Sequence, residues 1–210
     1  SFMFISISVE SLHPLTTVFY RVLIGALILT FMVYAKGLRL PFTIYAWLAF
    51  MVMGIVGYVL PFFLISWGQL SVNSGIAGMI MATMPLITMI LAHYLVDGEN
   101  LNRYKVLGFT FGIGGIGVLL GPIFEGGGQA VYGGIAIFIA ASSYAVNTIL
   151  VRRLPKLNPF ISTSGVLIAA TIMVFPIWLF VVPANSEAVS TLVLSSTIWL
   201  GIGPTAIATL

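Results

Sequence analysis

The sequence contains no cysteine and very little charge. Without cysteine there is no disulfide, no thiol nucleophile and no thiolate metal site. Charged residues make up 6% of the chain, against roughly 25% in soluble domains. The net charge of +3 comes from only eight Lys and Arg against five Asp and Glu, too few for a nucleic-acid surface. HExxH, GxSxG and phosphate-binding glycine-loop motifs are missing as well, so we expect no enzyme, metal or cofactor.

Apolar residues dominate what is present. They form 60% of the sequence and give a mean hydropathy of +1.16, which indicates an integral membrane protein. A spanning helix needs about 20 apolar residues, and Pro, Gly and charge divide the chain into eight such segments, the first and last of them incomplete. The predicted segments are 1–12, 15–35, 43–68, 73–96, 104–123, 130–151, 160–182 and 191–210. The predicted fold is an all-α, polytopic helical bundle.

Lys and Arg are found at every second connection between these segments. Lys36, Arg39, Arg103, Lys105, Arg152, Arg153 and Lys156 all fall in alternate connections, and the other connections contain no Lys or Arg. Lys and Arg collect on the cytoplasmic side of membrane proteins. The basic connections are therefore expected in the cytoplasm.

A weak internal repeat joins the two halves. Pro14 and Pro159 open the second and seventh segments, and Gly54-Ile-Val-Gly57 in the third matches Gly201-Ile-Gly-Pro204 in the eighth. Matched elements are five segments apart along the chain. Because five is odd, the second copy is expected to lie inverted in the membrane, as in many transporters. The predicted repeats are 1–123 and 129–210. Their symmetry suggests roughly 17 further residues before Ser1 and roughly 58 after Leu210, giving ten helices in all.

The fourth segment combines small residues with a proline. Ser74, Gly78 and Ala82 share one helical face suited to close packing. Pro85 cannot donate to the carbonyl of Met81 and should bend the helix. The bend has two interpretations: a helix that lines a substrate pathway, or an ordinary kinked membrane helix. Pro61, Pro176 and Pro204 are also internal prolines.

The fifth segment is rich in glycine. It contains Gly112-Ile-Gly-Gly-Ile-Gly117, formally a dinucleotide-binding pattern, but the flanking apolar helix at membrane depth excludes that interpretation. Gly108 with Gly112, and Gly117 with Gly121, instead form GxxxG pairs. They predict close helix packing within the chain or in a homodimer.

Arg21 is the single basic residue well inside a predicted span, about a turn and a half from its outer end. A charge there is a functional hypothesis by default. The alternative is that its side chain extends to the outer interface or pairs with Glu10. His13 and His93 lie 80 residues apart without a carboxylate at ligand spacing, so neither predicts a metal site.

Polar and aromatic side chains mark two further helix faces. The third segment carries Tyr58, Pro61, Phe62, Ile65 and Gln69 on one face. Gln69 is expected to bind a polar substrate, to cap the helix or to meet water. The sixth segment presents Tyr144 and Asn147 on a small and polar surface. This surface is expected to point inward, either at packed helices or at a cavity.

Several motifs together resemble the EamA-type transporters of the drug/metabolite transporter superfamily. They are Trp67-Gly-Gln69, Ser74-Gly-Ile-Ala77, Ala82-Thr-Met-Pro-Leu86, Gly98-Glu99-Asn-Leu101, Gly108, Pro14-Leu15 with Arg21, and Ala141-Ser-Ser-Tyr-Ala145 through Val151-Arg-Arg153. The resemblance implies a ten-helix inner-membrane carrier of two inverted five-helix repeats, which moves amino acids, related metabolites or drugs. It also implies a cavity away from Arg21, lined by Tyr58, Gln69, Thr83, Tyr144 and Asn147.

The sequence thus predicts a secondary transporter of small metabolites or drugs, working by alternating access and exporting its substrate. Expected hinge or packing positions are Pro61, Pro85, Gly78, Gly108 and Gly112. The expected partners are a small-molecule substrate, the lipid bilayer and a second copy of the chain, with no nucleic acid. Two alternatives remain, a structural or assembly protein and an intramembrane enzyme. The substrate, the coupling ion and the oligomeric state are not specified by the sequence.

Overall fold

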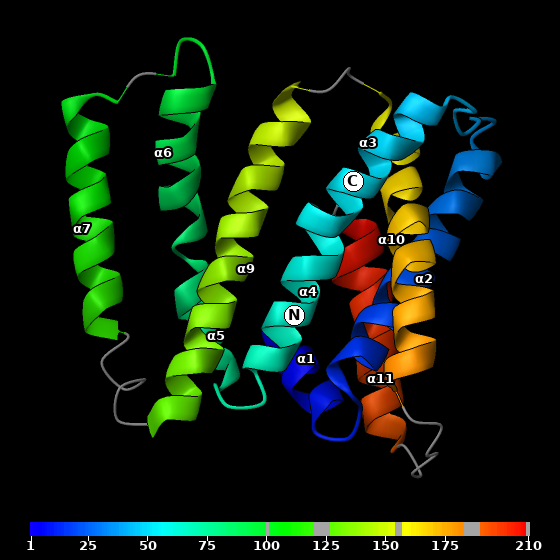
Figure 1. The fold of residues 1–210 in the computed structure, drawn as a ribbon, viewed down its shortest axis with the longest axis horizontal. Coiled ribbons are helices and arrows are strands. Elements are labelled where there is room, and N and C mark those ends of the chain that lie inside the picture. Colours follow the sequence, from blue (N-terminus) through cyan, green and yellow to red (C-terminus); the bar gives the residue numbers. More distant parts are fainter. Residues whose placement is uncertain (100, 120–126, 154–156, 183–189, 209–210) are drawn as a thin grey trace.

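The computed structural model describes residues 1–99, 101–119, 127–153, 157–182 and 190–208, and the described chain is helical without strands. Figure 1 shows the helices running between two ends of the molecule. In chain order the elements are α1 (Phe2–Val9), α2 (Pro14–Ala35), α3 (Ile44–Gly54), the π-helical segment η1 (Ile55–Val59), α4 (Leu60–Gly68), α5 (Ser74–Met81), α6 (Met84–Leu95), α7 (Arg103–Leu119), α9 (Gly127–Arg153), α10 (Pro159–Val181), α11 (Thr191–Leu200) and the π-helical η2 (Gly201–Ile207).

Five helical stretches of the described chain are long and apolar enough to cross a membrane: 14–35, 44–68, 74–95, 128–152 and 159–181. A shorter apolar stretch follows at 191–207. These ranges confirm the predicted all-α membrane bundle, within a few residues at each boundary. The predicted segment ends at 123 and 210, and Gly121, lie outside the described residues.

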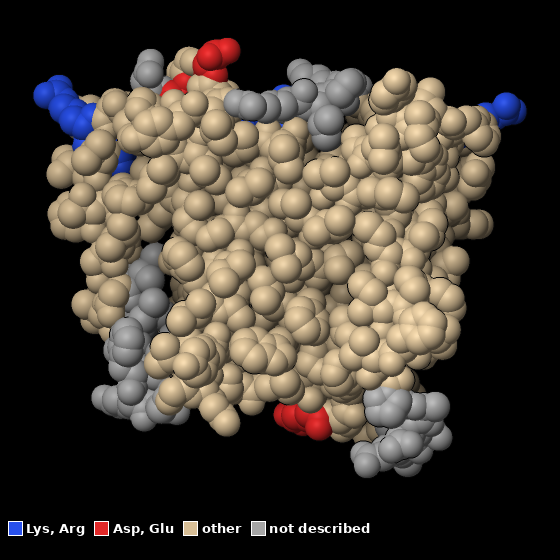
Figure 2. Space-filling view, viewed as in Figure 1, with Lys and Arg blue, Asp and Glu red and all other residues tan. Residues whose placement is uncertain are grey.

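Apart from Arg21, the charged side chains of the described residues lie at the two ends of the molecule. Five basic residues lie together at one end, which we call the basic end. Lys36 and Arg39 follow α2, Arg103 and Lys105 begin α7, and Arg152 is at the end of α9. In Figure 2 Lys and Arg lie along the upper edge, and an uncharged band separates this edge from the lower one. The basic residues predicted to share one side of the membrane therefore lie at one end of the fold. We call the other end the opposite end.

Three prolines coincide with departures from α-helical geometry. The fourth predicted segment is interrupted at Ala82 and Thr83, just before Pro85, because proline has no N–H for the carbonyl four residues earlier. Pro61 directly follows η1, and Pro204 lies inside η2. Pro176 differs, since α10 continues through it from Pro159 to Val181.

The core lies where α2 packs against α10. Val22, Leu29, Leu167 and Val174 are fully buried between these helices and their neighbours. The hydroxyls of Thr30 and Ser164 are 2.9 Å apart and add a hydrogen bond across the pair. In a membrane the favourable contribution comes from such close packing and hydrogen bonding, because lipid is as apolar as the core.

Two glycines make matching contacts with these helices. A Cβ on Gly54 of α3 would lie 3.3 Å from the carbonyl oxygen of Val166 in α10. A Cβ on Gly201 of η2 would lie 3.3 Å from the carbonyl oxygen of Arg21 in α2. Val166 and Arg21 each lie seven residues after the proline that opens their helix. The same contact therefore occurs twice. In one case the first half of the chain provides the glycine and the second half the carbonyl, and in the other case these roles are reversed.

Candidate functional site

A cavity of about 870 Å³ enters the bundle from the basic end. Exposed residues of the connections, including Thr43, Leu157 and Pro159, line its mouth. Tyr58 and Asn147 line its inner part, and Tyr58 lies about 20 Å along the helix from Ile44 at 1.5 Å per residue. The cavity thus reaches well into the span, and most of its wall is apolar, as in pockets for small molecules.

The inner end of this cavity brings two predicted site residues together. Gly57, next to Tyr58, lies against Asn147 of α9, and a Cβ on Gly57 would be 2.6 Å from the Asn147 amide nitrogen. The Asn147 Oδ1 atom is buried and accepts no hydrogen bond within the described chain. An amide acceptor at the end of a cavity, without a protein partner, is available for a donor group of a ligand.

The local backbone explains why Tyr58 reaches the cavity. In the π-helical η1 the regular hydrogen bonding is displaced, and Ser143 of α9 donates to the freed carbonyl of Val56 at 2.6 Å. Single-turn π segments are frequent at functional sites. This side-chain bond fixes η1 against α9, so that Tyr58 and Asn147 lie at the same level.

Aromatic rings close the cavity beyond Tyr58. The ring of Phe62 contacts Tyr58 edge-on at 5.6 Å between centroids and contacts Tyr144 at 6.5 Å. We call Tyr58, Phe62 and Tyr144 the aromatic layer. Tyr144 therefore belongs to the wall behind the cavity rather than to the residues that line it.

Arg21 lies on the far side of the aromatic layer. Its guanidinium carbon is 3.6 Å from the centroid of the Phe62 ring, and its Nε donates to Thr205 Oγ1 at 2.7 Å. The side chain is only 6% exposed. The expectation that it reaches the interface or pairs with Glu10 is therefore wrong. Among the described residues the ion pairs join Glu99 to Lys105 and to Arg152.

Two other predicted binding residues lie away from the cavity. Gln69 follows α4 at the opposite end, is buried, and both its amide atoms lack a partner within the described chain. Thr83 lies in the break between α5 and α6, where its hydroxyl donates to the carbonyl of Ile80 at 2.7 Å. Its hydrogen bond stabilises the interrupted backbone. A substrate contact at Gln69 or Thr83 stays a prediction.

The predicted glycine contacts differ from one another. A Cβ on Gly78 would meet Phe2 at 3.7 Å, and one on Gly112 would meet Leu86 at 3.1 Å. Gly108 has no described atom within 4 Å of that position, so its predicted packing within the chain is absent from the described structure. A contact of Gly108 with a second copy stays a prediction. The hinge roles of Pro61 and Pro85 also stay predictions.

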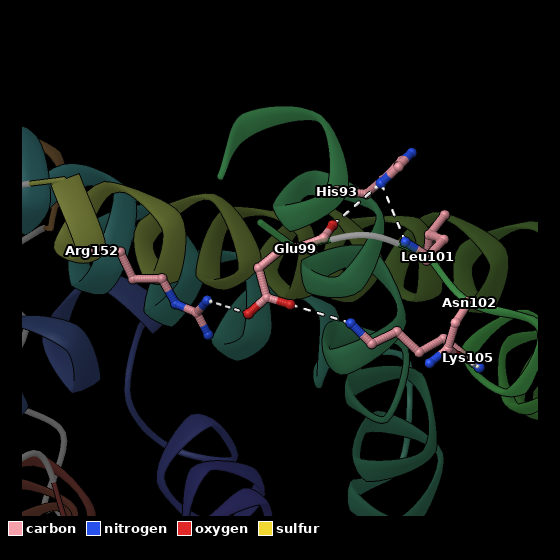
Figure 3. Close-up of polar contacts among 6 residues, drawn as sticks. All are labelled: His93, Glu99, Leu101, Asn102, Lys105 and Arg152. Carbon is pink, nitrogen blue, oxygen red and sulfur yellow. Dashed lines mark hydrogen bonds and ion pairs between the residues drawn. The ribbon is translucent and has the colours of Figure 1, made fainter. Parts of the chain in front are cut away.

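One polar cluster ties the two halves of the chain at the basic end. Figure 3 shows the Glu99 carboxylate between Lys105, at 3.3 Å, and Arg152, at 3.4 Å. The hydrogen bond and charge of Lys105, followed by those of Arg152, hold the pKa of Glu99 below its ordinary value. This carboxylate is exposed, and exposed ion pairs contribute little to stability. The described residues include no group of three His, Asp or Glu side chains that could hold a metal.

A sequence profile described as the EamA-like transporter family matches residues 1–121, more than half of the chain. The chain belongs to this family. Among curated relatives, an uncharacterized transporter in the trpA 3′ region of Buchnera aphidicola subsp. Schlechtendalia chinensis is 28% identical over 147 residues, covering 70% of the chain and 48% of the relative. The uncharacterized transporter YoaV of Bacillus subtilis (strain 168) is 22% identical over 141 residues, covering 67% and 48%.

The chain spans about half the length of these curated relatives. A solved protein crystal structure superposes on the EamA-like chain with a TM-score of 0.71 and 22% identity, covering 99% of the chain and 73% of that structure. At that identity the likeness shows the shared fold alone. Together with the apolar helices, these findings place the chain among integral, multi-pass membrane proteins.

The sequence places Phe62 on the same helix face as Tyr58, but it indicates neither the contact of Phe62 with Arg21 nor the other surroundings of Arg21. Arg21 stood out as the single charge within a span, but its partner Thr205 lies 184 residues away in the sequence. No local pattern links the two positions. The residues around Phe62 have the apolar and aromatic pattern of an ordinary helix core. The contact of Phe62 with the Arg21 guanidinium therefore could not be predicted from the sequence.

Proposed function

We propose that the protein is a secondary transporter of small molecules that works by alternating access. The observation that carries the proposal is the cavity, which is open at the basic end and closed beyond Tyr58 and Asn147 by the aromatic layer. A pathway open on one side and shut on the other is the geometry that alternating access requires. Membership of the EamA-like transporter family supports it.

The matched glycine contacts support the division into two inverted repeats, 1–123 and 129–210. Gly54 contacts α10 as Gly201 contacts α2, and both glycines adjoin a π-helical segment. α2 and α10 run in opposite directions in Figure 1, as inversion requires. Two equivalent halves that exchange contacts provide the two related packings between which a carrier moves.

The charge at the basic end supports a proposal for the direction of transport. Basic connections face the cytoplasm in membrane proteins, so the cavity opens to the cytoplasm and loads substrate there. We propose export from the cell, and, since the named relatives are from bacteria, location in the cytoplasmic membrane.

A tryptophan that fills the cavity tests this function. Ala49 lines the cavity, whereas its neighbour Leu48 is 52% exposed and lies outside the lining, on the surface expected to face lipid. Cells that overexpress the protein are screened against a panel of amino acids and amphipathic antimicrobial compounds, and efflux of each hit is then measured in proteoliposomes. We expect Ala49→Trp to reduce efflux by about 10-fold or more, since a blocked pathway removes substrate binding, and Leu48→Trp to retain it. Equal efflux from both variants would argue that this cavity is not the pathway.

A further inference from the structure

The described spans contain one charged side chain that has no carboxylate partner. All five acidic residues of the chain, at positions 10, 97, 99, 125 and 187, lie outside the five spanning helices. Arg21 is buried to more than nine-tenths within the first of them. An unpaired charge at membrane depth is costly, and such residues normally pair with another group or bind a ligand.

The contacts of Arg21 leave most of its donors unused. A guanidinium has five N–H donors arranged as a planar fork. Nε donates to Thr205, and the terminal nitrogens make no hydrogen bond to a described residue. Phe62 beneath the guanidinium provides a cation–π contact, which stabilises the charge without using these donors. The fork geometry matches a carboxylate, which accepts two parallel hydrogen bonds.

The position of Arg21 relates it to the cavity. α2 begins at the opposite end, and Arg21 is seven residues into it, about 10 Å along the axis. The cavity approaches from the basic end and stops at Tyr58, which contacts the same Phe62 ring as Arg21. Arg21 therefore lies between the closed end of the cavity and the opposite side of the membrane, one ring beyond the cavity.

We propose that Arg21 is the anion-binding group of the transport pathway and that it recognises a carboxylate of the substrate. This inference rests on the proposed transport function and assigns the substrate a negatively charged group. One guanidinium neutralises one negative charge, so a monocarboxylate forms a neutral pair within the span. A phosphate ester, with a charge of about −1.5 to −2 at pH 7, would leave an excess of negative charge. In the structure the aromatic layer separates Arg21 from the cavity. During transport the aromatic layer rearranges, so that a substrate in the cavity reaches Arg21.

The test is a binding measurement on the purified full chain with three probes that share a phenyl ring. Phenylacetate carries a carboxylate, phenylacetamide is its neutral counterpart, and phenyl phosphate carries the larger charge. We expect the wild type to bind phenylacetate about 10- to 100-fold more tightly than phenylacetamide, the range of a charge-assisted hydrogen-bonded pair. Phenyl phosphate should bind more weakly than phenylacetate. Calorimetry gives the affinities, and thermal unfolding without probe shows that each variant is folded.

Arg21→Gln should bring the ratio of the two affinities close to one. Arg21→Lys keeps the charge but loses the planar fork of donors, so its ratio should be intermediate. If Arg21→Gln does not fold, the ratio in Arg21→Lys is compared with the wild-type ratio instead. Arg39→Gln removes an equal charge from the exposed connection after α2 and should leave the ratio unchanged. A wild-type ratio near one, an unchanged ratio in both Arg21 variants, or tighter binding of phenyl phosphate would each overturn the proposal.

These outcomes are separable from failure of the transport function. If proteoliposomes move none of the screened solutes while carboxylate binding depends on Arg21, the anion site stands and the proposed function is wrong. If the protein transports solutes without preference for carboxylates and Arg21→Gln transports equally well, the function stands and the anion site is wrong.

Discussion

Gly133→Ala should lower the free energy of unfolding by about 3 kcal/mol, because the added methyl group has no space where α9 crosses α4. A Cβ on Gly133 would lie 2.8 Å from the carbonyl oxygen of Gly68, and would also press on the Ser71 hydroxyl and on Val72. The contact is reciprocal, since a Cβ on Gly68 would lie 2.7 Å from the carbonyl oxygen of Gly133. Backbone atoms cannot rotate away as a flexible side chain can, so the helices must separate.

The control for this prediction is Gly114→Ala on α7. No described atom lies within 4 Å of a Cβ at Gly114, and alanine favours helix over glycine by about 1 kcal/mol, so stability should be unchanged or slightly raised. Thermal unfolding of the purified variants in one detergent compares the two. Similar melting temperatures for Gly133→Ala and Gly114→Ala would contradict the described crossing of α4 and α9.

Asn147→Ala should reduce transport by about 10-fold, through loss of a hydrogen bond to substrate at the inner end of the cavity. Asn147 lines the inner end of the cavity, and its buried Oδ1 has no described partner, so a bound substrate is the group that would satisfy it. Efflux of a screened substrate from proteoliposomes is the measurement. Thr148→Ala is the control, because its hydroxyl donates to the Tyr144 carbonyl of its own helix and does not line the cavity.

Gly57 provides an independent way to disturb the same amide. A Cβ there would lie 2.6 to 2.9 Å from the atoms of the Asn147 amide, so Gly57→Ala should displace it and also reduce transport. Because both substitutions act on one contact, the double variant should be little worse than Asn147→Ala alone. Full additivity, or unchanged transport in Asn147→Ala, would remove Asn147 from the substrate site.

The helices and their order were predictable from the sequence because a membrane imposes simple rules. A span needs a long apolar run, and Lys and Arg collect on one side, so segments such as 15–35 and 160–182 are confirmed closely by α2 and α10. The interruption beside Pro85 was also predictable, since a missing N–H has a local consequence.

The tight helix contacts were less predictable, since every glycine looks alike in a sequence. The dense glycines of the fifth segment suggested packing, yet Gly108 and Gly114 meet no described neighbour. The single glycines Gly68 and Gly133 instead allow two backbones to touch. Which glycine matters depends on where another helix crosses, and that is set by packing between elements far apart in the chain.

The candidate site was only partly predictable for the same reason. Tyr58 and Asn147 were expected from their polarity on apolar helices, and the structure brings them to one cavity. The sequence leaves both a functional and a structural role open for Arg21, because its contacts with Phe62 and Thr205 cannot be inferred from it. Gln69 has similar polarity but lies at the opposite end of the molecule, and composition alone does not separate these cases.

Accessibility of one introduced cysteine tests the central claim most directly, that the cavity is a substrate pathway open toward the cytoplasm. The 210 residues contain no cysteine, so Ala49→Cys would be the single thiol among them. A membrane-impermeant maleimide should label it rapidly in inverted vesicles, where the cytoplasmic face is outside, and slowly in right-side-out vesicles. A transported substrate should slow the labelling. Labelling only from the right-side-out face, or equally from both without protection by substrate, would contradict the account.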